Sequence, residues 1–267
     1  MKGALPEHYR WQRYSLREKL LRYLAYLVTI VVVFWSVRTL DIFWPWVWDA
    51  PGEIADLLRR MTPPNLSRWD EIFWAMIETI NIATLATFLS LFLALPTAYI
   101  SAQNTTPNNL TLWLGRFILV ATRSVNTIIW ALLFVAIFGP GVIAGILAIA
   151  FRSIGFVGKL MAEAIEEIDR KPVEAIEATG ASKGKVVLFA IIPQVLPAFF
   201  AVSILRWDIN IRESTVLGLV GAGGIGLILQ GAIDTFAWQV AATVLIAILA
   251  VVIFGEIVSG WLRSRVI

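Results

Sequence analysis

The sequence MAEAIEEIDRKPVEAIEATGASKGKVVLFAIIPQVLPAF, residues 161–199, makes up most of a charged segment that lies between strongly apolar runs. This segment, Lys159–Pro197, is a hydrophilic loop between membrane-type stretches. From Met161 onward it holds six acids and four bases before apolar sequence resumes: Glu163, Glu166, Glu167, Asp169, Glu174, Glu177, Arg170, Lys171, Lys183 and Lys185.

The charged segment contains the start and stop signals of a short helix. Pro172 suits the first helical position, Glu174 would place negative charge in the first turn, and Gly180 suits the residue past the end. Ser182 can cap a second helix that runs into the bilayer. A helix this short is unstable alone in water. We therefore expect it to dock against another protein.

The composition indicates a membrane protein. The chain has 267 residues, of which 58% are hydrophobic and 15% charged, with a mean hydropathy of +0.77. A soluble domain carries about 25% charged residues. The net charge of +3 fits positive-inside topology better than nucleic-acid binding. The chain has no cysteine, which excludes disulfides, thiolate chemistry and cysteine metal sites.

Six apolar runs predict an all-α, polytopic membrane protein with six transmembrane helices, since about 20 apolar residues cross a bilayer core. The third run is interrupted by Arg116 and Arg123, and the fourth is short. The six runs are Leu20–Val37, Ile72–Ile100, Trp113–Phe138, Val142–Val157, Val186–Ile211 and Trp238–Leu262. We expect loops at residues 38–71, 101–112 and 159–193.

The distribution of basic residues predicts the orientation. Residues 1–19 are basic, and Arg263 and Arg265 close the last run, so both termini and the charged loop are expected to be cytoplasmic. The first run follows no cleavable signal pattern and is expected to be an anchor. The basic N-terminus is either a positive-inside flank or an amphipathic segment on anionic lipid. The external loop 38–71 would place its tryptophans in an interfacial belt: Trp44, Trp46, Trp48 and Trp69.

The charged loop resembles the cytoplasmic loop of ABC importer permeases. Glu174 and Ala175 are followed by Gly180 six residues after the glutamate and by Pro193 thirteen residues after the glycine. The chain departs from the family pattern at Ile176, Ala190 and Ile192. The resemblance implies a type I permease fold whose loop forms a coupling helix in a groove of a cytoplasmic ATPase. The implied coupling residues are Glu174, Ala175, Glu177, Ala178, Gly180, Ala181 and Pro193.

The segments Arg123–Gly141 and Arg206–Gly226 resemble the phosphonate branch of these permeases, which also serves phosphite and hypophosphite. The resemblance covers about residues 70–262, although Asp208 stands where a glutamate is expected. It divides the chain into 1–71, with the basic segment, first span and tryptophan-rich loop, and 72–267, the permease core. The alternatives are an ABC permease for methionine, glycine betaine or phosphate, and a stand-alone secondary carrier.

Ionisable groups at membrane depth favour an anion path, because they rarely face lipid. Arg123 and Arg206 are expected near mid-bilayer, and Asp208 and Arg212 are spaced to pair on one helix face. The alternative is that such groups form buried ion pairs, for example Glu78 with Arg123. The predicted path residues are Arg123, Asn126, Arg206, Asp208, Asn210, Arg212 and Glu213.

The glycines between residues 218 and 231 formally match G-x-G-x-x-G. A dinucleotide fold would need a preceding strand and a soluble βαβ unit, and neither is predicted. We expect instead two short helical pieces that pack closely at the outer mouth, with backbone lining a cavity. The predicted gate residues are Gly221, Gly223, Gly224 and Gly226.

The sequence shows no nucleophile–histidine pairing, metal-ligand cluster or Walker A motif. We expect a non-catalytic pore subunit of the bacterial cytoplasmic membrane that binds no metal or cofactor, with ATP and magnesium on a partner ATPase. The expected assembly is a homodimer, or a pair with a similar permease, together with two ATPases and an external binding protein. Membrane lipid is expected to surround it, and we expect no nucleic-acid partner. The predicted mechanism is alternating access.

Overall fold

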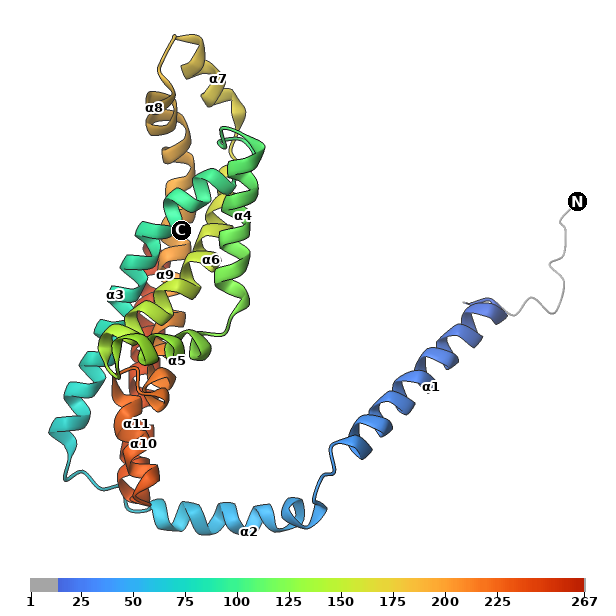
Figure 1. Ribbon diagram of the computed structural model, residues 1–267, viewed down its shortest axis with the longest axis vertical. Helices are drawn as coiled ribbons and strands as arrows, with labels where there is room; N and C mark the ends of the chain where they lie inside the picture. The colour runs from blue at the N-terminus through green and yellow to red at the C-terminus, as the bar shows by residue number, and fades with distance from the viewer. Residues whose placement is uncertain (1–13, 267) are drawn as a thin grey trace, which may run out of the picture. The chain divides into compact units, whose positions relative to one another are not determined.

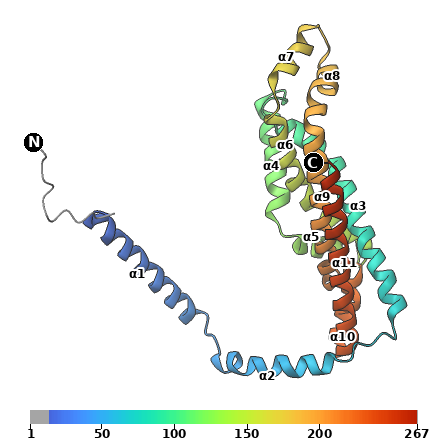
Figure 2. The same ribbon diagram turned by 180° about the vertical axis from the view of Figure 1, so that it is seen from behind.

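The computed structural model describes residues 14–266, which are helical throughout apart from short connections. The chain divides into two compact units, residues 1–56 and 57–267. Figures 1 and 2 show the order of the elements. These are α1 (Leu16–Thr39), α2 (Trp44–Met61), α3 (Trp69–Ser101), α4 (Asn109–Ser124), α5 (Thr127–Phe138), α6 (Val142–Glu166), α7 (Arg170–Ala178), α8 (Lys183–Val186), the π-helix η1 (Val187–Ile191), α9 (Ile192–Leu217), the 3₁₀ turn η2 (Gly218–Val220), α10 (Ile225–Asp234) and α11 (Trp238–Val266).

The first unit contains α1 and most of α2. The predicted first span is confirmed as α1, which begins with a capping box formed by Ser15 and Glu18. The predicted loop 38–71 is wrong for residues 44–61, because α2 occupies them and takes in Trp44, Trp46 and Trp48. Residues 1–13, which carry most of the predicted basic segment, lie outside the described residues.

Within residues 14–266, five helical segments are long and apolar enough to cross a membrane, and α4 with α5 can supply a sixth. The predicted second and sixth spans are confirmed as α3 and α11. The fourth span is longer than predicted, since α6 continues through Lys159 to Glu166. The fifth span begins earlier, at Lys183, and α9 ends only at Leu217.

The predicted third span is not one straight helix. Its two halves, α4 and α5, meet at an angle of 90°. The break lies at Val125 and Asn126, because Asn126 has an extended backbone and its side chain accepts a hydrogen bond from the amide of Ile128 at 3.1 Å. An N-cap of this kind starts a new helix rather than continuing the old one.

The core of the second unit forms where small side chains let helices approach closely. Its most extensive helix pair is α3 with α6, and α9 packs against both. A Cβ added to Gly155 of α6 would lie 2.5 Å from the carbonyl oxygen of Leu119 in α4. Because nothing larger than glycine fits there, α4 and α6 lie almost in backbone contact. In both views α7 and α8 lie at one end of this unit and α10 at the other (Figures 1 and 2).

Candidate functional site

The short helix predicted within the charged loop is confirmed as α7, whereas its coupling role stays a prediction. It begins at Arg170 after the N-cap Asp169, so Pro172 is its third residue and not its first, and Glu174 lies beyond the first turn where it was predicted. Gly180 lies past its end with φ of 76°, as predicted. Ser182 holds the N-cap position of α8, as predicted, but its side chain makes no capping hydrogen bond. Of the seven predicted coupling residues only Ala181 is partly buried, while the others are exposed. This face of α7 and the start of α9 are therefore free to meet a partner.

Hydrogen bonds tie the start of α7 to the start of α9. The side chain of Gln194 accepts a hydrogen bond from the Asp169 amide at 3.0 Å and donates one to the Asp169 carbonyl oxygen at 3.3 Å. Val173 and Ile168 pack against the cluster of apolar side chains between α3, α6 and α9. Force on α7 can thus pass directly to α9.

Polar side chains from α5, α6 and α9 converge in the middle of the second unit, in what we call the central cluster. One Glu213 carboxylate oxygen lies 3.3 Å from Nη1 of Arg152 and 3.3 Å from Nη2 of Arg206. Thr127 accepts a hydrogen bond from Arg152 at 2.8 Å and donates one to Glu213 at 2.8 Å. The full cluster is Thr127, Arg152, Ser153, Arg206, Asn210 and Glu213.

Hydroxyl and amide groups complete the bonding of the central cluster. Nε of Arg206 donates to the Ser153 hydroxyl at 2.8 Å, and this hydroxyl lies 3.3 Å from Oδ1 of Asn210. Asn210 also donates to Thr87 of α3 at 2.7 Å. Arg206 is only 2% exposed, and its guanidinium lies 5.3 Å from the ring centroid of Phe156. The cluster therefore links α3, α5, α6 and α9.

Charge in the central cluster is shared unequally. Two guanidinium groups face one carboxylate, so the cluster carries one excess positive charge. Arg206 is fully buried, whereas the side chain of Arg152 is 36% exposed. Arg152 is the member through which an anion could reach the cluster.

Asp208 and Arg212 form the predicted ion pair on another face of α9. Asp208 is 4% exposed, and its Oδ1 is the buried side-chain atom without a hydrogen-bond partner among the described residues. The side chain of Arg212 is 50% exposed. The pair is thus separate from the central cluster, and its cationic half is accessible.

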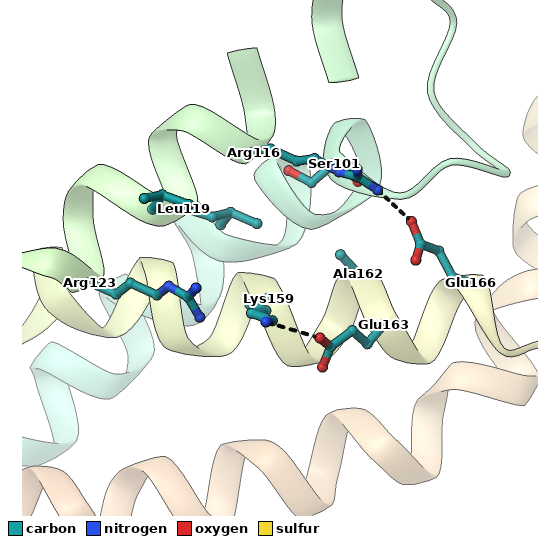
Figure 3. A pocket seen from close by; sticks show the side chains of 9 residues that line it. Ser101, Arg116, Leu119, Arg123, Lys159, Ala162, Glu163 and Glu166 are labelled. Atoms are coloured by element: carbon teal, nitrogen blue, oxygen red, sulfur yellow. Dashed lines mark hydrogen bonds and ion pairs between the residues drawn. The ribbon is translucent and has the colours of Figure 1, made fainter. Parts of the chain in front are cut away.

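The structure does not bring Arg123 and Asn126 to the central cluster. Asn126 caps α5, and Arg123 lies in a cavity of about 260 Å³ that also contacts Arg116 and Lys159 (Figure 3). The suggested ion pair of Arg123 with Glu78 is not formed, because Glu78 accepts a hydrogen bond from the Gly224 amide at 2.8 Å.

The predicted gate glycines form a tight segment between η2 and α10. Gly224 has φ of 75°, a left-handed conformation that favours glycine, and its amide is held by Glu78. A Cβ on Gly226 would lie 2.8 Å from the Cα atom of Gly218, so the two short helical pieces do pack closely. The amide of Gly141 also donates to the Gly221 carbonyl oxygen at 2.8 Å. Contacts from α3 and from the turn before α6 thus fix this segment.

Three hydroxyl residues of the central region were not predicted: Thr87, Thr127 and Ser153. Hydroxyl residues are frequent in these helices and mostly bond to their own backbone, so the sequence alone does not separate these three from the others. In the part of the chain that the structure describes, no three metal-ligating side chains converge.

Comparison with known proteins gives consistent results. The family described as "Binding-protein-dependent transport system inner membrane component" matches residues 94–267. The phosphite transport system permease protein PtxC of Stutzerimonas stutzeri is 41% identical over 212 residues, which cover 79% of this chain and 77% of that protein. The phosphate-import permease protein PhnE of Mycolicibacterium smegmatis is 39% identical over 223 residues, 83% of this chain and 41% of that protein.

Among solved structures, a chain of the MetNI methionine ABC transporter in an inward-facing conformation is similar in fold. The TM-score is 0.62 at 22% identity, and the match covers 73% of this chain and 96% of that chain.

Proposed function

The chain belongs to the family of binding-protein-dependent transport system inner membrane components, and from this we propose that it is the permease subunit of an ABC importer for a phosphorus oxyanion. It is a multi-pass protein of the inner membrane. The observation that carries the proposal is the 41% identity to a phosphite permease over most of both chains.

The charges of the second unit support the proposed cargo class. Guanidinium groups stay charged and match the oxygens of phosphorus oxyanions. Arg123, Arg152 and Arg212 are each accessible in part, and we propose that they line the path. We propose that Arg206, Asn210 and Glu213 hold α5, α6 and α9 around the path, because Arg206 and Asn210 are buried and Glu213 pairs with Arg206. Because one relative is named for phosphite and another for phosphate, both anions are candidate cargoes in this proposal.

The exposed face of α7 supports coupling to a separate ATPase. Glu174 and Glu177 are exposed, and the hydrogen bonds of Gln194 link α7 to α9. We propose that two ATPase subunits bind ATP and magnesium and move α7 of each permease copy. In this proposal α7 and both termini face the cytoplasm, and the binding protein docks on the external side of the membrane. The path is then opened alternately to the two sides.

A co-purification experiment tests this against the stand-alone carrier. Glu174→Arg reverses a charge on the exposed face of α7, and Gly180→Val puts a β-branched residue at φ of 76°, at a strain of about 1–3 kcal/mol. We expect the ATPase to co-purify with the wild-type chain and to be lost with either variant. Glu53→Arg, at an exposed glutamate of α2, is the charge-matched control and should retain it.

A chain that transports without an ATPase, or that retains it equally in all three variants, would contradict the coupling role of α7. Recovery of each folded variant, measured by gel filtration in detergent, separates a lost contact from misfolding.

A further inference from the structure

A second set of charged side chains lies on the face of α6 that meets α4. The set starts at Arg152 and continues seven residues later with Lys159, then four residues later with Glu163 and three residues later with Glu166. These spacings put all four side chains on one side of the helix. Gly155 lies within this stripe, where α4 and α6 are in near backbone contact. The charged stripe therefore runs from the central cluster toward the end of α6 that leads into α7.

A cavity of about 260 Å³ opens between α4 and α6 at this stripe, and we call it the inner pocket. Its volume is just under the range of about 300–1,000 Å³ found for drug-sized ligands, which suits a small hydrated ion. Its charged lining is Arg116, Arg123, Lys159, Glu163 and Glu166, three cations against two carboxylates.

Two of the three cations in the inner pocket already have carboxylate partners. Arg116 lies 3.2 Å from Glu166 and also donates to the Ser101 carbonyl oxygen at 3.3 Å, while Lys159 lies 3.3 Å from Glu163. Arg123 has no hydrogen-bond or ion-pair partner among residues 14–266. Figure 3 shows its guanidinium extending from α4 toward Lys159. The excess positive charge of the pocket thus lies on a group whose five donors have no partner in the described part of the chain.

The position of Arg123 relates the inner pocket to the central cluster. A Cβ on Gly155 would lie 2.9 Å from Cβ of Arg123, so Arg123 stands beside α6 one turn beyond Arg152. Arg123 and Lys159 are therefore the next cations along α6 for an anion that leaves Arg152 toward the α7 end.

We infer that the inner pocket binds a phosphorus oxyanion through Arg123, with Lys159 beside it. A guanidinium offers two parallel donors to such a group, which an ammonium does not. The oxyanion can be the cargo on its way to the cytoplasm or the phosphate of a lipid headgroup. The first source rests on the proposed function, whereas the binding chemistry itself does not.

Binding measurements on the purified complex of this chain with its ATPase, in phosphatidylcholine nanodiscs, test the inference. Phosphite is the soluble probe, followed by broadening of its ³¹P signal, and native mass spectrometry reports retained phospholipid. We expect Arg123→Gln to weaken one of these two interactions roughly tenfold or more, because a charge-assisted pair is lost. Arg123→Lys should restore part of it. Arg263→Gln, at an exposed arginine of α11 outside the pocket, should change neither.

Loss of phosphite broadening identifies the cargo as the source, and loss of phospholipid identifies the lipid. Equal values for wild type and Arg123→Gln in both measurements would overturn the inference. ATP-driven uptake by the wild-type complex is measured alongside. If the wild-type complex takes up no phosphorus oxyanion, the proposed function fails. If its uptake is normal but Arg123→Gln leaves both binding measurements unchanged, only the inference about the inner pocket fails.

Discussion

The central cluster, through Arg152, and the inner pocket share one face of α6 but balance their charges differently. In the central cluster Glu213 contacts two guanidinium groups, and Arg206 is 2% exposed. In the inner pocket the side chains of Lys159 and Glu163 are 45% and 49% exposed, and Arg123 has no partner within residues 14–266. Similar residue types therefore occupy two very different environments.

This difference separates a structural role, which we assign to the central cluster, from an anion-binding role, which we assign to the inner pocket. A buried charge must be compensated within the protein, and removal of its partner is strongly destabilising, whereas an exposed pair contributes little to stability. The central cluster fastens α3, α5, α6 and α9 to one another. The inner pocket is accessible, and its Arg123 has no carboxylate partner within residues 14–266. A site that binds an anion transiently needs such an uncompensated cation.

The largest effect should come from the carboxylate of the central cluster. Glu213→Ala leaves Arg206 buried with no counter-charge, and we expect a loss of about 3–5 kcal/mol in the free energy of unfolding. Glu163→Ala removes a carboxylate from the inner pocket, where half-exposed Lys159 can be solvated, and should cost about 0–1 kcal/mol. Unfolding midpoints in detergent measure both. Equal losses for the two variants would remove the distinction between the two regions.

A smaller effect should follow from the hydroxyl shell. Ser153→Ala leaves Nε of Arg206 without its acceptor in the buried cluster, at an expected cost of about 1–3 kcal/mol. Ser90→Ala is the matched control, since Ser90 is equally buried but, within residues 14–266, its hydroxyl bonds only to the carbonyl oxygen of Thr87 in its own helix. If Ser90→Ala proves the more damaging of the two, Ser153 does not act through Arg206.

The sequence predicts the features of the fold that depend on local patterns. Apolar runs located α1, α3 and α11, and the signals at Gly180 and Ser182 located the end of α7 and the start of α8. The bend at Asn126 was missed because the apolar stretches on either side of it were read as one span, across polar residues that include the capping Asn126. The length of α6 was underestimated because Lys159–Glu166 is charged although helical.

The sites were predictable only where they are local. Asp208 and Arg212 are one helical turn apart, and their pairing follows from periodicity. Glu213 meets Arg152 from 61 residues away, which helical periodicity within one element does not reveal. The same holds for the contact of Glu78 with Gly224, which replaced the suggested pair with Arg123.

ATP-dependent uptake in proteoliposomes is the most direct test of the central claim that this permease carries a phosphorus oxyanion for a separate motor. The vesicles would hold this chain with its ATPase, with the binding protein added outside, and would be offered labelled phosphite, methylphosphonate, phosphate or methionine. We predict uptake of at least one phosphorus oxyanion, only with ATP in the compartment of the ATPase, and none of methionine. Uptake without ATP, or of methionine in preference to all three phosphorus compounds, would contradict the account.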